Sequence, residues 1–161
     1  MNSFIPDRIE LAPQDVPYFE DIRASDVAGR HTGKGIARLQ GEIIDLLTRL
    51  GADSIYFLAG QYPAGRGGRV RYGFQAHFRF QGVPGRLDCA ALPLRKETPQ
   101  KKDRALAQAL YLLRDELKAL VNSIMYKPGA IPLVPYLIGA GGQTVTEYLI
   151  ETQALPLLTS G

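Results

Sequence analysis

The stretch RVRYGFQAHFRF, residues 69–80, alternates apolar and polar side chains almost without a break. Successive side chains of a β-strand point to opposite faces of its sheet, so this alternation predicts a strand with one buried and one exposed face. The side chains expected in the core are Val70, Tyr72, Phe74, Ala76, Phe78 and Phe80, and those expected on the exposed face are Arg69, Arg71, Gln75, His77 and Arg79. The strand is therefore predicted to hold a row of cations on one side of a sheet.

The segments on both sides of this strand extend the sheet. DSIYFLAGQY, residues 53–62, is rich in β-branched and aromatic residues, and the PAGRGG that follows it is typical of a turn. After the central strand, GVPG at residues 82–85 is predicted to turn the chain into a third strand, RLDCAALPL, at residues 86–94. Three consecutive strands with short connections predict an antiparallel meander.

Helical periodicity flanks the predicted sheet. Between residues 35 and 50 apolar residues recur every three or four positions, and Gly51 follows as a helix-terminating glycine. A second helix is predicted over residues 99–125, with Thr98 as its N-cap and Pro99 at its first position. We therefore expect an α+β fold of the order α-β-β-β-α, with both helices on the apolar face of a three-stranded antiparallel sheet.

Three regions are expected along the 161 residues: an acidic N-terminal arm (1–29), a basic α-β-β-β-α domain (30–127) and a proline-rich tail (128–161). The arm contains three prolines and no sustained periodicity, which predicts an extended segment with at most a short helical turn near residues 18–24. In the tail, Thr144 and Glu147 have the spacing of a capping box and predict a short C-terminal helix.

Charge is distributed unevenly between these regions. The net charge is +3, but the first 29 residues hold six acidic and two basic residues, a net charge of −4. Residues 30–104 hold fourteen basic and six acidic residues, a net charge of +8. Most of these cations are arginine, whose planar guanidinium group suits phosphate. The central region is therefore expected to attract a polyanion.

Cysteine use and hydropathy predict the compartment. Cys89 is the only cysteine, so an internal disulfide is excluded, which is typical of a reducing environment. The sequence has no apolar run of about 18 residues, and its first residues lack the basic start and apolar stretch of a signal peptide. We expect a cytoplasmic protein with no membrane partner.

The motif GRHTGKG, residues 29–35, invites comparison with a nucleotide-binding loop. It lacks the four-residue gap of a P-loop and the Ser or Thr after the lysine, and no strand precedes it. A weaker hypothesis is that the amide groups of the helix start, beside Arg30, His31 and Lys34, contact one phosphate of a nucleic acid backbone.

Few residues favour catalysis. His31, His77 and Cys89 do not have the spacing of a zinc site, and no nucleophile is paired with a base, so we expect no metal, no cofactor and no enzymatic activity. A metal-dependent nuclease is a further alternative, because Glu42 lies on the first predicted helix and Asp88 on the third predicted strand, and carboxylates on a helix and on strands can hold magnesium in such enzymes. No second acidic residue follows on the strand.

The strongest functional signal is the clustering of cations on the predicted sheet and at the start of the second helix. Cations in the first turn oppose the helix dipole, so they favour a compensating anion. The predicted nucleic-acid-binding residues are Arg66, Arg69, Arg71, His77, Arg79, Arg86, Lys101, Lys102 and Arg104. The sequence thus predicts a protein that binds nucleic acid through phosphates. It does not distinguish DNA from RNA, or single strands from double strands.

Two further hypotheses come from the ends of the chain. In one, the protein is an interaction subunit that recognises a protein partner, or itself, through the apolar tail and the acidic arm. In the other, the arm mimics phosphate and competes with nucleic acid for the basic face. The alternative for the arm is simple docking on the core through Phe4, Ile5, Tyr18 and Phe19.

The element order, together with KKDRALAQAL at residues 101–110, resembles the double-stranded-RNA-binding domain, whose second helix also begins with lysines followed by spaced alanines. The resemblance covers about residues 35–124. It implies that Lys101, Lys102 and Arg104 reach phosphates across a groove. The strand-strand-strand-helix order with a basic hairpin is also similar to the core of Rad52-type single-strand annealing proteins, so the kind of nucleic acid stays open.

Overall fold

The central strand β2 (Arg71–Phe80) lies between β1 (Ala52–Tyr62) and β3 (Val83–Ala90) in an antiparallel three-stranded sheet. The helix α1 (Ile36–Arg49) precedes the sheet along the chain, and α2 (Pro99–Ser123) follows it. The predicted α+β class and the order α-β-β-β-α are confirmed.

The computed structural model describes residues 16–23, 29, 32–63 and 69–152. Shorter elements are the 3₁₀ turns η1 (Phe19–Asp21), η2 (Ile124–Tyr126) and η3 (Val134–Tyr136) and the C-terminal helix α3 (Val145–Glu151). Within the described ranges, no helix is both long and apolar enough to cross a membrane.

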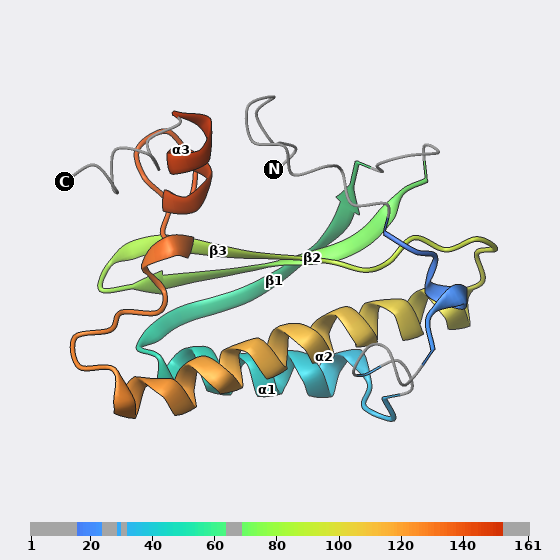
Figure 1. Cartoon of the computed structure of the whole chain (residues 1–161), viewed down its shortest axis with the longest axis horizontal. Helices are drawn as coiled ribbons and strands as arrows, with labels where there is room; N and C mark the ends of the chain where they lie inside the picture. Colours follow the sequence, from blue (N-terminus) through green and yellow to red (C-terminus); the bar gives the residue numbers. More distant parts are fainter. Residues whose placement is uncertain (1–15, 24–28, 30–31, 64–68, 153–161) are drawn as a thin grey trace.

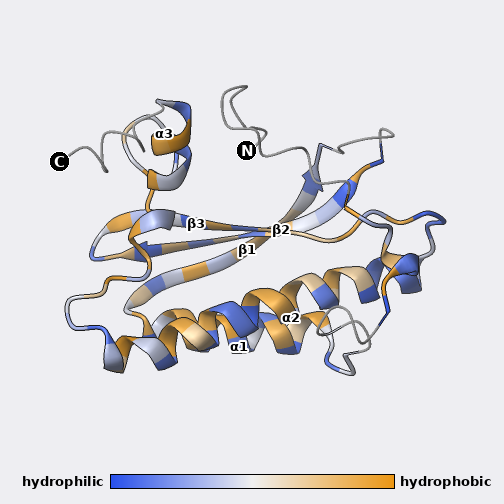
Figure 2. Cartoon of the chain, viewed as in Figure 1, coloured by the Kyte–Doolittle hydropathy of each residue, from blue (hydrophilic) through white to orange (hydrophobic). Residues whose placement is uncertain are grey.

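Both long helices lie side by side against one face of the sheet (Figure 1). Phe74, Ala76 and Phe78 of β2 are buried on this side, whereas Arg79 is exposed, as the alternation in the sequence predicts. The prediction is wrong for Val70, which precedes the strand and is exposed. Hydrophobic and hydrophilic residues are interspersed along α1 and α2, as expected of amphipathic helices (Figure 2). The opposite face of the sheet, called the outer face below, carries the polar side chains of β2.

The core is built mainly from leucine and phenylalanine side chains of the helices and the sheet. Leu39 and Leu47 of α1 and Leu110 and Leu117 of α2 are almost completely buried. Each such side chain contributes about 1.5–3 kcal/mol to stability by leaving water. Phe19 is equally buried, and its backbone N–H donates to the carbonyl oxygen of Pro93 at 2.9 Å, so the arm is anchored in the core.

Local signals place the helix ends correctly. Gly51 adopts a φ of +97° directly after Leu50, the C-cap of α1. The Thr98 hydroxyl accepts the backbone N–H of Lys101 at 3.2 Å as the N-cap of α2. Thr144 and Glu147 form the predicted capping box at the start of α3. The second helix ends at residue 123, two residues earlier than predicted, and continues as η2.

The predicted turn at GVPG is wrong. The hairpin turns at Gln81 and Gly82, with φ values of +50° and +78°, and β3 begins at residue 83 instead of residue 86. A two-residue loop with positive φ at both positions matches the twist of an antiparallel pair, so the turn forms there although glutamine is unusual in it. Pro84 fits within β3 because the strand has a strand neighbour on one side only.

The tail packs against the free side of β3. Leu137 forms an isolated bridge with Gly85, and the N–H of Ile138 donates to the carbonyl oxygen of Pro84 at 2.8 Å. Leu133 is fully buried, so the tail also contributes to the core. In the part of the chain that the structure describes, β1 is therefore the edge strand without a neighbour on its other side.

Candidate nucleic-acid interface

The predicted binding residues fall on two parts of the molecule. Arg71, His77, Arg79 and Arg86 lie on the outer face of the sheet, by their positions in β2 and β3. Lys101, Lys102 and Arg104 lie in the first turns of α2, on the helical side. Arg69 directly precedes β2, and Arg66 lies outside the described residues. The fold therefore does not gather the predicted set on one face.

Arg69, Arg95, Lys96 and Lys101 form a cluster that we call the cationic end. Nη1 of Arg69 donates to the carbonyl oxygens of Leu94 at 3.1 Å and Arg95 at 2.6 Å. The guanidinium groups of Arg69 and Arg95 lie over the Tyr18 ring, 5.6 and 4.6 Å from its centroid. Arginine stacks well on aromatic rings, so these contacts fix the loop before α2 against the arm.

The cationic end already holds a carboxylate. Glu20 of the arm accepts the backbone N–H of Arg95 at 3.0 Å and of Lys96 at 2.8 Å, and the Lys101 ammonium lies 3.4 Å away. Burial raises the pKa of Glu20, but these donors outweigh it and lower the pKa to about 2. Asp21 forms an ion pair with Arg95 beside it. This end therefore binds an oxyanion supplied by the protein itself.

The other cations at the start of α2 are bound less firmly. The Lys102 ammonium lies 4.1 Å from the centroid of the Tyr72 ring, and the Tyr72 hydroxyl donates to Glu97. Arg104 is exposed and has no ion-pair partner among the described residues. The first turn of α2 holds no acidic residue, but the exposed Asp103 lies between Lys102 and Arg104. The helix start thus carries one exposed cation, Arg104, and one partly exposed cation, Lys102.

On the outer face, Asp88 is the centre of a hydrogen-bond network. Its carboxylate accepts from the Tyr62 hydroxyl at 2.9 Å, from Nε2 of Gln75 at 3.0 Å and from Nε of Arg86 at 3.0 Å. Arg86 also pairs with Glu147 of α3 and is only 8% exposed. Arg86 is neutralised by carboxylates of the sheet and of α3, so it joins the tail to the sheet. Because it is buried, it is not part of an accessible surface.

The remaining outer-face cations differ in accessibility. Arg71 is half-buried and donates to the carbonyl oxygens of Ala91 at 2.9 Å and Ala90 at 3.3 Å. Arg79 is exposed and has no ion pair with any described residue. Of the predicted sheet cations in the described ranges, Arg79 is therefore the one best placed for a phosphate.

His77 is part of an aromatic stack that the sequence did not reveal. Its ring is parallel to that of Tyr56 on β1, with centroids 5.0 Å apart and an interplanar angle of 8°. Nε2 of His77 lies 3.1 Å from Oε1 of Gln75. Burial and the charge of Arg86 lower the pKa of His77, against a smaller opposing effect of Asp88. At neutral pH His77 is thus an uncharged ring and not a cation.

A shallow hollow lies farther along β1 on the outer face. Gly60 of β1 pairs with Gly73 of β2, and neither contributes a side chain. The hollow has a volume of about 240 Å³ and is bordered by Leu58, Tyr62 and Gln75. A Cβ atom on Gly73 would lie 2.5 Å from the Tyr62 ring, whereas one on Gly60 would meet nothing within 4 Å. The open side of the hollow therefore faces β1.

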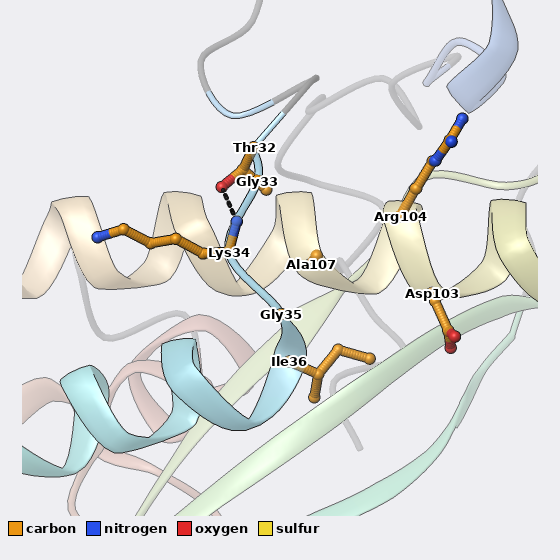
Figure 3. Close-up of a pocket in the computed structure, with 8 residues that line it drawn as sticks. All are labelled: Thr32, Gly33, Lys34, Gly35, Ile36, Asp103, Arg104 and Ala107. Atoms are coloured by element: carbon orange, nitrogen blue, oxygen red, sulfur yellow. Dashed lines mark hydrogen bonds between the residues drawn. The ribbon is translucent and has the colours of Figure 1, made fainter.

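A larger pocket of about 550 Å³ lies between the start of α1 and the first turns of α2 (Figure 3). Lys34 at its rim binds Glu42 at 2.8 Å, and its side chain and that of Arg104 point in different directions (Figure 3). Arg30 and His31, which were expected to assist a phosphate contact here, lie outside the described residues. Lys34 and Arg104 do not converge on one bound group.

The two carboxylates considered for a nuclease are not brought together. Glu42 lies between the helices, where the Lys34 hydrogen bond is the main cause that lowers its pKa. Arg114 of α2 approaches it to 4.0 Å. Asp88 lies on the outer face of the sheet, on the side away from both helices. Among the described residues, no three His, Cys, Asp or Glu side chains are grouped to hold a metal ion.

Comparisons with known protein families, with curated proteins and with solved structures found no match to this chain. The resemblances to double-stranded-RNA-binding domains and to Rad52-type proteins therefore stay predictions.

Proposed function

We propose that this chain binds nucleic acid through its backbone phosphates, without a chemical step. The observation that carries the proposal is the seating of the Glu20 carboxylate on two backbone N–H groups and Lys101. Consecutive amide groups and a nearby ammonium also form the donor set that holds phosphate oxygens in proteins. A phosphate at this position would replace Glu20 on the same donors.

Accessible cations outside the cationic end support the same function. Arg79 on the outer face and Arg104 on α2 are exposed and form no ion pair with a described residue, although Asp53 is the cross-strand neighbour of Arg79. Lys102 is held over a ring and keeps its charge available. Three phosphate contacts would release counterions, so affinity should fall roughly 20- to 40-fold between about 50 and about 200 mM salt.

The free Cys89 is buried and therefore keeps its thiol protected. We propose the cytoplasm as the setting, because a single unpaired cysteine suits a reducing compartment.

The test is a gel-shift series with single-stranded and double-stranded DNA and RNA at two salt concentrations. Arg79→Glu and Arg104→Glu, made together, should weaken binding at least tenfold. Lys118→Glu is the matched control, because Lys118 is an exposed lysine of α2 beyond its first turns and its reversal changes charge by the same amount per site. Absence of binding to all four ligands at low salt would refute the proposal.

A protein-interaction subunit is the second candidate, and exposed apolar side chains at the end of α2 favour it. Met125 is 74% exposed, Tyr126 81% and Ile131 52%. Such a cluster is typical of a contact surface. Since the tail also supplies Leu133 to the core, deletion of the tail would destabilise the fold, and a loss of interaction could not be told from unfolding. Met125→Ser with Tyr126→Ser is the cleaner change, and a shift in oligomeric state would support this candidate.

A further inference from the structure

An aromatic ring with one uncovered side lies at the edge of the sheet. Tyr56 is 54% exposed and belongs to β1, the last strand on that side. The His77 ring covers one side of it. In the part of the chain that the structure describes, no strand lies next to β1 on the other side. A flat group can therefore stack on Tyr56 and extend the existing pair of rings.

The stack is held by the network behind it. His77 contacts Gln75, and Gln75 donates to Asp88, which also accepts from Tyr62 and Arg86. Each ring or amide is thus fixed by at least one neighbour. A stacking surface held in this way loses little conformational entropy when a ligand arrives.

The surroundings of the stack contain a shallow hollow and a cation. The hollow at Gly60 lies four residues from Tyr56 along β1, a distance of about 13 Å on the same face. Arg79 follows His77 on the outer face by two residues, about 7 Å along β2. The outer face thus combines an aromatic surface, a shallow hollow and an exposed positive charge.

From this arrangement, and resting on the proposed function, we infer that the ligand is single-stranded nucleic acid and that one of its bases stacks on the free side of Tyr56. Bases of a single strand can turn outward and stack on aromatic side chains, whereas those of a duplex are stacked on one another. Arg79 would contact a phosphate next to the stacked base. The cationic end would then hold the same strand or another segment of it.

The test compares binding of fluorescein-labelled oligothymidine, oligouridine and a duplex of equal length, by fluorescence anisotropy at low salt. Tyr56→Ala should weaken single-strand binding at least about fivefold. Tyr56→Phe keeps the ring and should bind within about twofold of the wild type. Tyr126→Ala is the matched control, because it also removes an exposed tyrosine ring, but one that lies in η2 and not on the sheet. Duplex binding should not change in any variant.

The outcomes separate this inference from the proposed function. If the wild type binds a single strand and all three variants bind equally well, the base-stacking inference fails and phosphate binding stands. Tighter binding of the duplex than of either single strand has the same consequence. If the wild type binds none of the oligonucleotides, both the function and the inference fail, and a protein partner becomes the explanation of the exposed ring.

A second measurement needs no substitution and covers the case in which Tyr56→Ala does not fold. Oligonucleotides containing 5-iodouracil are irradiated in complex with the wild-type protein, and the crosslinked peptide is sequenced by mass spectrometry. The inference requires a crosslink at Tyr56. Crosslinks confined to other aromatic residues would overturn it.

Discussion

The cationic end and the outer face both concentrate arginine or lysine, but their charges are neutralised differently. At the cationic end, Arg95 and Lys101 already contact carboxylates of the arm. On the outer face, Arg86 is buried between two carboxylates, whereas Arg79 is exposed. A count of cations in the sequence therefore does not measure the charge that a ligand meets, because acidic residues of the protein neutralise part of it.

The arm contains both of the features that the sequence left as alternatives. Phe19 is buried in the core, as docking requires, while Glu20 sits on the donors that a phosphate would use. Phe4 and Ile5, which were also expected to dock, lie outside the described residues. Deletion of residues 1–29 would remove the Phe19 anchor and the carboxylates together. Single substitutions therefore distinguish docking from competition with phosphate better.

The largest effect is expected at the anchor of the arm. Phe19→Ala removes a fully buried aromatic ring and should lower the free energy of unfolding by about 3–5 kcal/mol. Chemical denaturation measures this change. Exposed Tyr126→Ala is the control and should alter stability by less than about 0.5 kcal/mol. A Phe19→Ala protein as stable as the wild type would show that the arm is not anchored in the core.

The next effect contrasts two arginines of the outer face. Arg86→Met leaves the carboxylates of Asp88 and Glu147 without their buried partner and should cost about 3 kcal/mol of stability. Arg79→Met should change stability by less than about 0.5 kcal/mol but weaken binding to nucleic acid. Thermal melts and gel shifts of the two variants test this. The contrast is refuted if the Arg86→Met protein binds nucleic acid more weakly than the wild type but melts at the same temperature.

A smaller effect is expected from neutralising the arm while keeping its anchor. Glu20→Gln with Asp21→Asn removes the carboxylates that compete for Arg95 and Lys101. Affinity for nucleic acid at low salt should rise several-fold, and the gain should shrink as salt screens both interactions. If the double variant binds nucleic acid no more tightly than the wild type, the carboxylates of the arm do not compete with the ligand. Docking on the core is then the role of the arm.

A pH dependence of stability is expected as well. The pKa of Glu20 is lowered from 4.5 to about 2 in the folded protein. A depressed folded-state pKa stabilises the protein fully above the unfolded value, and this contribution is lost as the pH falls from about 4.5 towards 2. The stability difference between wild type and Glu20→Gln should therefore shrink over that range in urea titrations. A constant difference would mean that Glu20 is not held as an ion.

Much of the fold was predictable from the sequence because the signals are local. Alternation assigned Phe74 and Phe78 to the core and Arg79 to solvent, and Thr98 and Gly51 marked helix ends. Strand pleat, helix periodicity and capping each involve residues within about four positions of one another. The start of β3 was missed because the turn uses Gln81, a residue that the sequence rules do not associate with positive φ.

The candidate site depended on contacts between distant parts of the chain. Arg86 meets Glu147 across 61 positions, and Glu20 meets Lys101 across 81. Tyr56 stands beside His77 only because the strands pair in one register, which includes an irregularity between Asp53 and Tyr56. Local patterns specify which elements form and which side chains carry charge. Which charges are already paired, and which ring stays exposed, depends on packing between elements, and no local pattern specifies this packing.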